Sequence, residues 1–233
     1  MWDSLGVSKF GGELENLKIK LLDMSSLVEA GIERSIHAVI HKDRAAAELV
    51  FETEARINTI ELEIDALAID LLALHQPMAS NLRFIVAALK INTNLERMGD
   101  LAVNIAHSAM ELIDQPTGEP MVDLPLIASL AQSMVRHSMD AFVSHDVGLA
   151  RRVLVSDDAV DSLRTACYHQ LVSFMEKDPR NIRRAVNLLS VTRALERLAD
   201  HSTNVAEDVL FYVQGIEVRH NSESRGSTSQ TTE

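Results

Sequence analysis

Two segments of this chain, a hundred residues apart, carry the same sequence pattern. Residues 81–107 and 181–207 align without a gap, and ten of the 27 aligned positions are identical. The identical positions include a charged motif, LERxxD, in which the glutamate and the aspartate are four residues apart. Self-similarity at a fixed period is the sequence signature of a duplicated structural unit. The chain is therefore expected to consist of two related halves.

The spacing of the apolar residues predicts three long helices in each half. Leu, Ile, Val, Ala and Met recur at intervals of three and four, which is the pattern of an amphipathic helix. The predicted helices cover 13–40, 45–74, 82–112, 127–143, 148–175 and 182–213. Because short turns between helices make neighbours antiparallel, the predicted fold class is all-α, with two tandem three-helix antiparallel bundles related by a pseudo-two-fold axis.

Turn residues mark the ends of these helices and the boundary between the halves. Asp43 is expected to cap the second helix, Ser80 or Asn81 the third, and Gly215 is expected to end the last. The tripeptides at 41–43 and 144–146 occupy corresponding places in the two halves. Three of the five prolines lie within 114–125, the predicted boundary. The predicted domains are 10–113 and 120–215, followed by a disordered tail at 216–233 that is rich in Ser, Thr and charge.

Composition excludes several classes of function. The net charge of −12 repels nucleic acid and attracts cations. The single cysteine, Cys167, allows no internal disulfide. The N-terminus is polar and unlike a secretion signal, and no apolar run approaches the roughly 18 residues of a membrane span. We therefore expect a cytoplasmic protein that binds no nucleic acid.

Carboxylates share one face on the third helix of each half. Residues four apart lie on the same side of a helix, which aligns Glu96 with Asp100 and Glu196 with Asp200. The preceding helices add further acidic and amide residues at this spacing. These are Glu54, Asn58, Glu61 and Asp65 in the first half, and Asp157 and Asp161 in the second.

The register between these two preceding helices is open from sequence alone. Aligning Ile57 with Val160 pairs Asn58 with Asp161, but it then places Arg164 and Tyr168 opposite Glu61 and Asp65. Aligning Glu61 and Asp65 with Asp157 and Asp161 is the other possibility, but the apolar positions of the two helices then fall out of step with each other.

Clustered carboxylates favour a bound cation, because like charges repel unless something neutralises them. Oxygen ligands suit hard ions such as Mg, Mn, Ca or Fe, with Zn as an alternative. The competing interpretation is a solvated acidic face neutralised by Arg97 and Arg197. The nine histidines form no ExxH or HExxH pair, which argues against a ferritin-like di-iron oxidase.

The third helix is apolar on a second side as well. The residues there are Phe84, Ala88, Ile91, Leu95, Met98, Ala102 and Ile105. Such a helix needs cover on two sides, and the second cover could be the other bundle or a second subunit. We predict a homodimer from this feature.

The quoted motifs resemble the PhoU family, the accessory proteins of the phosphate-specific transport system. Residues 75–107 (HQPMASNLRFIVAALKINTNLERMGDLAVNIAH) resemble the hallmark segment of that family, and 195–215 resemble its second copy. INTIELEID at 57–65 and DDAVD at 157–161 match its two preceding motifs. The resemblance covers about 10–215. Asn81 stands where the family usually has Asp, which changes a cap and leaves the acidic pattern intact.

The resemblance implies a fold of two three-helix bundles that bind clusters of metal ions through E(D)xxxD motifs. The implied ions are multinuclear Fe, or Zn, Mn or Mg. Carried over to this chain, the implied metal ligands are Glu61, Asp65, Glu96 and Asp100 in the first half, and Asp157, Asp161, Glu196 and Asp200 in the second.

The resemblance further implies a regulator that is not an enzyme. Such proteins repress the phosphate-starvation response and limit phosphate uptake. They are thought to link the ATPase subunit of the phosphate ABC transporter to a phosphate-sensing histidine kinase, and they would meet the membrane only through these partners. Two alternatives remain: a metal-dependent enzyme that uses the carboxylate patches, and a metal-independent helical scaffold.

Overall fold

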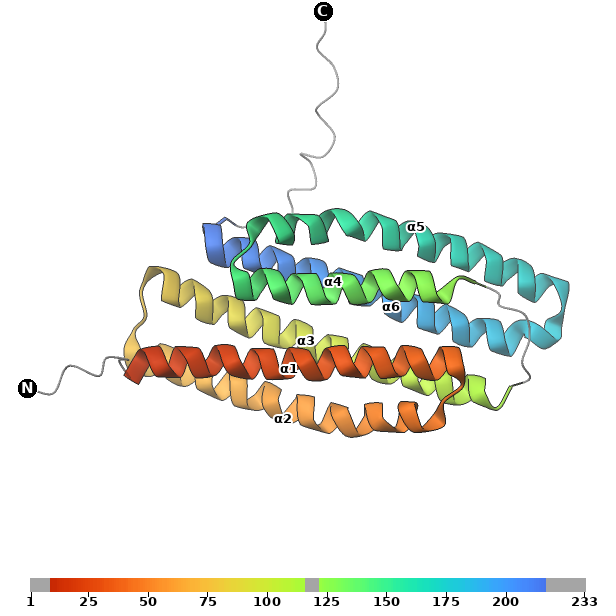
Figure 1. The fold of residues 1–233 in the computed structure, drawn as a ribbon, viewed down its shortest axis with the longest axis horizontal. Coiled ribbons are helices and arrows are strands. Elements are labelled where there is room, and N and C mark those ends of the chain that lie inside the picture. Colours follow the sequence, from red (N-terminus) through yellow and green to blue (C-terminus); the bar gives the residue numbers. More distant parts are fainter. Residues whose placement is uncertain (1–8, 116–121, 217–233) are drawn as a thin grey trace, which may run out of the picture.

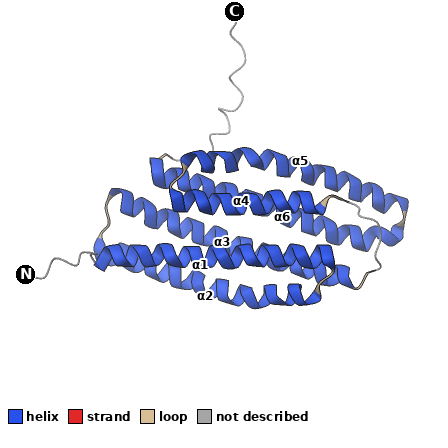
Figure 2. Cartoon of the chain, in the orientation of Figure 1, coloured by secondary structure: helices blue, strands red, loops and turns tan. Residues whose placement is uncertain are grey.

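The structure, a computed structural model, describes residues 9–115 and 122–216. In those residues it contains six α-helices and one short 3₁₀ helix, and no strand (Figures 1 and 2). The elements are α1 (Lys9–His41), α2 (Arg44–His75), α3 (Ala79–Ile113), α4 (Leu124–Ser144), α5 (Val147–Lys177), η1 (Pro179–Asn181) and α6 (Ile182–Gln214). The all-α prediction is confirmed. The predicted disordered tail lies, from residue 217 onward, outside the described residues.

The helices form two antiparallel three-helix bundles, α1–α3 and α4–α6, that lie side by side (Figure 1). The extensive contact between the bundles is made by α3 and α6, and α1 and α4 meet along a smaller strip. Among the described residues, α2 packs only on α1 and α3, and α5 packs only on its own bundle. All seven residues of the second apolar side of α3 are buried within the chain, with Ala102 facing Gly31 of α1 and Phe84 meeting Tyr212 of α6, which removes the need for another subunit on that side.

Buried side chains join the two bundles into one connected hydrophobic core. Phe84 of α3 stacks on Phe142 of α4 with ring centroids 5.9 Å apart, and the Tyr212 ring of α6 meets Phe84 edge-on at 5.5 Å. An ion pair crosses the same boundary, with Lys90 Nζ 3.4 Å from Asp208 Oδ1. Asp208 is only 1 % exposed, so this charge sits inside the contact between α3 and α6.

The duplication extends to the backbone of the first turn in each half. Asp43 and Asp146 each cap a helix by accepting a hydrogen bond from the backbone N–H three residues later. The residues before them, Lys42 and His145, both adopt a left-handed conformation with φ of 56°. The predicted Asp43 cap is confirmed. Gly215, with φ of 70°, ends α6 as predicted, because glycine tolerates this conformation without steric cost.

The pattern of buried residues decides the register that sequence left open. Asp43 and Asp146 are 103 residues apart, and every buried residue of α4 and of α5 has a buried counterpart 103 positions earlier, in α1 or α2. The third helices keep the offset of 100 that aligns Glu96 with Glu196. The second half is therefore three residues shorter at the connection between its last two helices. Ile57 is equivalent to Val160.

The start of α3 differs from the prediction. The helix begins at Ala79 after Met78, and no side chain caps it. Ser80 and Asn81 therefore lie inside the first helical turn, where their side chains cannot act as the cap. In the second half, Asp178 accepts a hydrogen bond from the backbone N–H of Arg180 at 2.9 Å and starts the 3₁₀ turn η1, which was not foreseen.

Candidate cation-binding site on the acidic helix faces

In the first bundle, acidic side chains of α2 and α3 lie near one another, and we call the strip that they form between the two helices the first acidic groove. Glu96 of α3 is partly enclosed, with 21 % of its side chain exposed, against 39 % for Asp100. Its pKa is raised above the ordinary glutamate value, first by burial and then by the negative charges of Asp100, Glu61 and Glu54. Carboxylates from both helices therefore lie near enough to disfavour one another's charged forms.

Asp65 lies one turn away from this cluster and is held by a buried amide. Asn92 of α3 is fully buried, and its Nδ2 donates to Asp65 Oδ1 at 2.9 Å and to the backbone oxygen of Glu61 at 3.0 Å. Asn92 fixes the spacing between α2 and α3 beside the acidic groove. Sequence reasoning missed it, although an amide at a position of the apolar stripe was the available signal.

Arg97 is the counter-ion that the chain itself supplies to the first acidic groove. Its Nε lies 3.3 Å from Glu96 Oε2, and its Nη1 lies 3.3 Å from Asp100 Oδ2. The guanidinium is more than half exposed, so these pairs are screened by solvent and individually weak. A bound cation would have to displace Arg97 from the two carboxylates.

In the second bundle, the groove between α5 and α6 brings together Asp161, Glu196 and Asp200. Burial, followed by the charges of Asp200 and Asp161, raises the pKa of Glu196, and Arg164 opposes the shift. Burial and Asp161 likewise raise the pKa of Asp200. Asp157 is half-buried one turn before Asp161 on the same face of α5.

The two acidic grooves are related but chemically different. With the register of 103 residues, Arg164 stands at the position of Glu61, and Tyr168 stands at the position of Asp65. Arg164 acts on Glu196 with a charge opposite in sign to that of Glu61 on Glu96. The second groove consequently carries fewer negative charges than the first.

The donor atoms suit a hard cation, but they are not assembled into a site. Within residues 9–115 and 122–216, no three acidic, histidine or cysteine side chains converge closely enough to hold a metal ion. Carboxylates on neighbouring turns of two helices can converge by rotating about their side-chain bonds. The grooves thus fit a hard cation in ligand type, and binding there would require side-chain movement.

His201 lies at the contact between α3 and α6, close to these grooves. Its Nδ1 is 2.9 Å from Asn94 Oδ1. Burial, followed by the positive charges of Arg197 and Arg97, lowers its pKa. The imidazole is therefore neutral at pH 7, and its polar contact joins the two bundles.

The fold and the two grooves define a duplicated helical-bundle protein with an acidic groove in each half. In the parts of the chain that are described, none of the helices has an apolar stretch that could span a lipid bilayer. The model of the PhoU domain family matches residues 21–109 and 124–209, one match in each bundle. The chain belongs to the PhoU family.

Relatives and solved structures agree with this assignment over nearly the whole chain. A "Phosphate-specific transport system accessory protein PhoU homolog" from Pseudomonas aeruginosa is 38 % identical over 215 residues, covering 91 % of this chain and 88 % of that protein. The accessory protein PhoU from Edwardsiella tarda is 32 % identical, covering 94 % and 92 %.

Two crystal structures have the same fold. PhoU from Pseudomonas aeruginosa superposes with a TM-score of 0.87 at 37 % identity, covering 89 % of this chain and all of that one. The "phosphate transport system regulatory protein PhoU" from Streptococcus pneumoniae gives a TM-score of 0.83 at 28 % identity, covering 90 % and 99 %. The chain is therefore an accessory and regulatory protein of phosphate-specific transport, from a family that is not enzymatic.

Proposed function

We propose that this protein is a cytoplasmic negative regulator of phosphate homeostasis. It links the ATPase subunit of the phosphate ABC transporter to a phosphate-sensing histidine kinase, and it represses the starvation response and phosphate uptake when phosphate is plentiful. The observation that carries the proposal is the match of both bundles to the family of phosphate-transport accessory proteins, at 38 % identity over 91 % of the chain.

A deletion strain tests this regulatory role. Without the protein, genes of the phosphate-starvation response, such as one for a secreted phosphatase, should be expressed in high phosphate. Reintroducing the wild-type gene should restore repression. Normal repression in the deletion strain would reject the proposed function.

The proposed function includes metal binding at the two acidic grooves. The proposed ligands are Glu61, Asp65, Glu96 and Asp100 between α2 and α3, and Asp157, Asp161, Glu196 and Asp200 between α5 and α6. The raised pKa of Glu96 supports this, because clustered carboxylates are relieved by a cation. A bound ion such as Fe, Mn, Mg or Zn would supply positive charge on a protein of net charge −12, and so offer a contact for phosphate or for carboxylates of a partner.

Metal analysis of matched variants separates this proposal from a metal-independent scaffold. Calorimetric titration with Mn²⁺ should give weaker binding for the double variant Glu96→Gln/Asp100→Asn. The control Glu48→Gln/Glu52→Gln removes the same charge from two exposed α2 residues at the same spacing, and it should bind as the wild type does. Equal binding by all three proteins would show that the ligand assignment is wrong.

The homodimer stays a prediction, now with a different surface in its support. The sequence argument for it used a side of α3 whose residues are buried within the chain itself. The outer surface of α2 instead exposes Leu62 and Ile69, at 66 % and 61 %, on one helix face. Apolar side chains of this size gathered on one surface favour association. Light scattering of the wild type and of Leu62→Glu/Ile69→Glu would test the dimer, which a monomeric wild type contradicts.

A further inference from the structure

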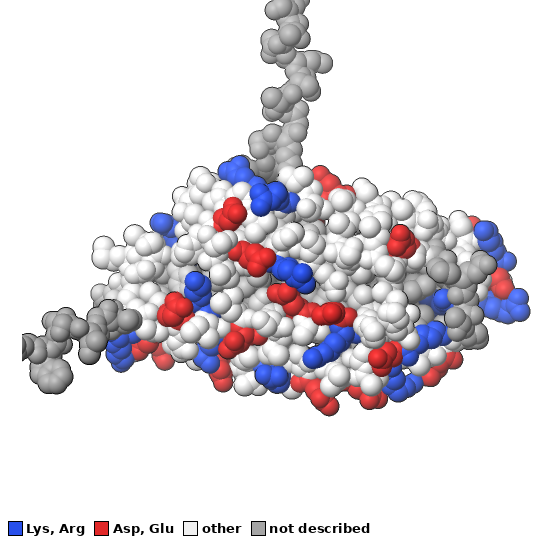
Figure 3. Space-filling view, viewed as in Figure 1, with Lys and Arg blue, Asp and Glu red and all other residues white. Residues whose placement is uncertain are grey.

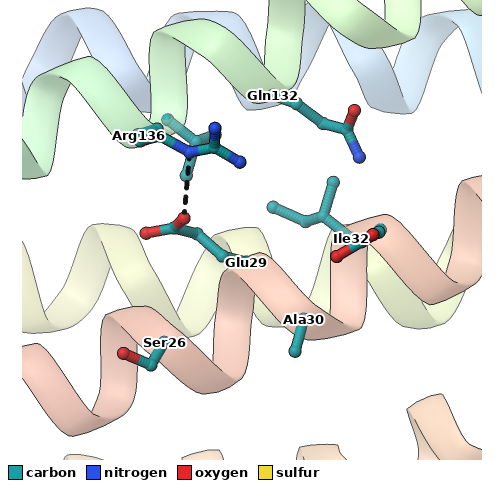
Figure 4. Close-up of a pocket in the computed structure, with 8 residues that line it drawn as sticks. Ser26, Glu29, Ala30, Ile32, Gln132 and Arg136 are labelled. Carbon is teal, nitrogen blue, oxygen red and sulfur yellow. Dashed lines mark ion pairs between the residues drawn. The ribbon is translucent and has the colours of Figure 1, made fainter.

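A groove separates α1 from α4 on the side of the molecule opposite the contact between α3 and α6. Its volume is about 340 Å³, and side chains of both bundles line it (Figure 4). The side chains that matter for its chemistry are Glu29, Ile32 and Glu33 from α1, and Gln132, Val135 and Arg136 from α4. The face in view in Figure 3 carries these two helices, and acidic side chains gather along its middle with basic ones among them.

These six residues are three pairs of equivalent positions in the duplicated fold. With the offset of 103 residues, Ile32 corresponds to Val135, Glu29 to Gln132 and Glu33 to Arg136. The pseudo-two-fold axis therefore passes through the groove. Ile32 and Val135 are both buried at the apolar floor, and the polar residues of the other two pairs border the opening.

Only one of the two equivalent halves of the groove has a positively charged side chain opposite its glutamate. On one side, Glu29 Oε2 lies 3.6 Å from Arg136 Nε, an ion pair that Figure 4 marks with a dashed line. The two-fold operation carries this pair onto Gln132 and Glu33. The position equivalent to the Glu29–Arg136 ion pair is therefore occupied by the Glu33 carboxylate and the Gln132 amide, and it has no guanidinium.

Glu33 is exposed on this side of the protein. Among the described residues, its carboxylate forms no ion pair and no hydrogen bond that meets standard geometric limits. A neighbouring hollow of about 290 Å³ shares Ala30 and Glu33 and continues along α1 past Arg34 and His37. The Arg34 guanidinium is engaged by Thr53, to whose hydroxyl oxygen it donates at 3.2 Å.

We propose that the groove between α1 and α4 is a docking site for an arginine side chain of a partner polypeptide. Its guanidinium would donate to the Glu33 carboxylate and to the Gln132 amide oxygen. It would stand beside Glu33 as the Arg136 guanidinium stands beside Glu29. Planar guanidinium groups suit acceptors spread over two side chains better than the ammonium of lysine does.

The charge of the whole protein favours a basic partner over an acidic one. A net charge of −12 steers positively charged segments toward the surface and repels negative ones. A metal ion fits the groove poorly, because Glu29 is already paired with Arg136 and Glu33 alone would be a single carboxylate ligand. The proposal does not depend on cation binding at the two acidic grooves.

Methyl NMR with a short peptide tests the docking site directly. The probe is N-acetyl-Ala-Arg-Ala amide, titrated into protein labelled at its isoleucine methyl groups, with Ile32 in the groove floor as reporter. The wild type should show a saturable shift of the Ile32 signal. The same peptide with citrulline, which keeps the shape of arginine and removes its charge, should leave the signal unchanged.

Three variants make the test specific. Glu33→Gln should weaken arginine-peptide binding by about two- to fivefold, the worth of one exposed ion pair. Glu15→Gln, which removes an exposed glutamate of α1 outside the groove, should bind as the wild type does. Gln132→Arg should fold normally and lose peptide binding, because it supplies the missing guanidinium from within the chain.

The proposal is overturned by any of three results. The first is the absence of a saturable Ile32 shift. The second is an equal response to the citrulline peptide. The third is wild-type affinity in Glu33→Gln or in a folded Gln132→Arg protein. Neither a failure of metal binding nor a normal deletion phenotype would alter these measurements, so the outcomes can be told apart.

Discussion

Two residues that pack together in one half of the protein can be replaced by the residues at the equivalent positions of the other half. This exchange tests whether the equivalent core positions of the two halves share space in the same way. Gly99 of α3 packs against Ile57 of α2, and Ala199 and Val160 hold the equivalent positions in the second half. A Cβ added to Gly99 would lie 3.2 Å from Ile57 Cδ1 and 3.4 Å from Ile57 Cγ2. The second half thus has one carbon more on α6 and one carbon fewer on α5.

The expected energies follow from these distances. Gly99→Ala should gain about 1 kcal/mol of helix propensity and lose about 1.5 kcal/mol to crowding against Ile57, a small net loss. Ile57→Val removes Cδ1 and should cost about 1 kcal/mol through the cavity it leaves. In the double variant the new Cβ fills that cavity, so its free energy of unfolding should equal or exceed that of the wild type. The two changes are therefore coupled by about 1.5 kcal/mol.

Urea unfolding followed by far-UV circular dichroism measures all four proteins of this cycle. The reciprocal exchange, Ala199→Gly with Val160→Ile, is the matched control and should show coupling of the same sign. If the double variant loses the sum of the two single losses within about 0.5 kcal/mol, the two sites do not share space and the reasoning fails.

Three further predictions follow from the caps, the buried ion pair and the acidic groove. Asp43→Ala and Asp146→Ala should each lower the free energy of unfolding by about 1 kcal/mol, because each carboxylate accepts a hydrogen bond from a helix N–H that has no other partner within the helix. Urea unfolding that finds a loss for only one of them would show that the two turns are not equivalent. Asp208→Asn should cost about 2–3 kcal/mol, because it removes the charge that compensates Lys90 between the bundles; a cost under about 1 kcal/mol in the same assay would mean that the pair behaves as an exposed one. Glu96→Gln should raise the free energy of unfolding at neutral pH, because folding raises the pKa of Glu96 and so disfavours its charged form. The folded wild type binds more protons than the unfolded chain between the two pKa values, so this gain should shrink as the pH falls toward the ordinary glutamate pKa of about 4.3. A gain that does not change with pH would contradict the raised pKa.

Much of the fold could be predicted because its signals are local. The apolar spacing placed the described helices within a few residues of their observed ends, and Asp43 and Gly215 marked two helix ends by their own chemistry. The start of α3 was placed wrongly, since Ser80 and Asn81 are common caps but Met78 precedes the helix here. A preference for capping is weaker than the geometry of the turn that positions the chain.

The candidate site was predicted only in part, because its geometry depends on how two helices lie side by side. Glu96 and Asp100 were expected on one face of the third helix, and there both carboxylates pair with Arg97. The pairing of Glu61 with Glu96, and of Arg164 with Glu196, required the register of α2 and α5. Asn92, the buried amide that holds Asp65, was not foreseen at all.

By itself the sequence determined the helices and their number in the described chain, because apolar intervals of three and four residues are a property of each segment alone. It also determined the duplication, because repeated motifs are visible when two segments are compared. The tertiary structure decided which charges meet. Arg97 pairs with Glu96 and Asp100, Arg164 acts on Glu196 where the first half has Glu61, and Glu33 lines the same groove as Gln132 of the other bundle. These encounters depend on the axial displacement of one helix along another, which packing of the whole core sets and no single helix encodes.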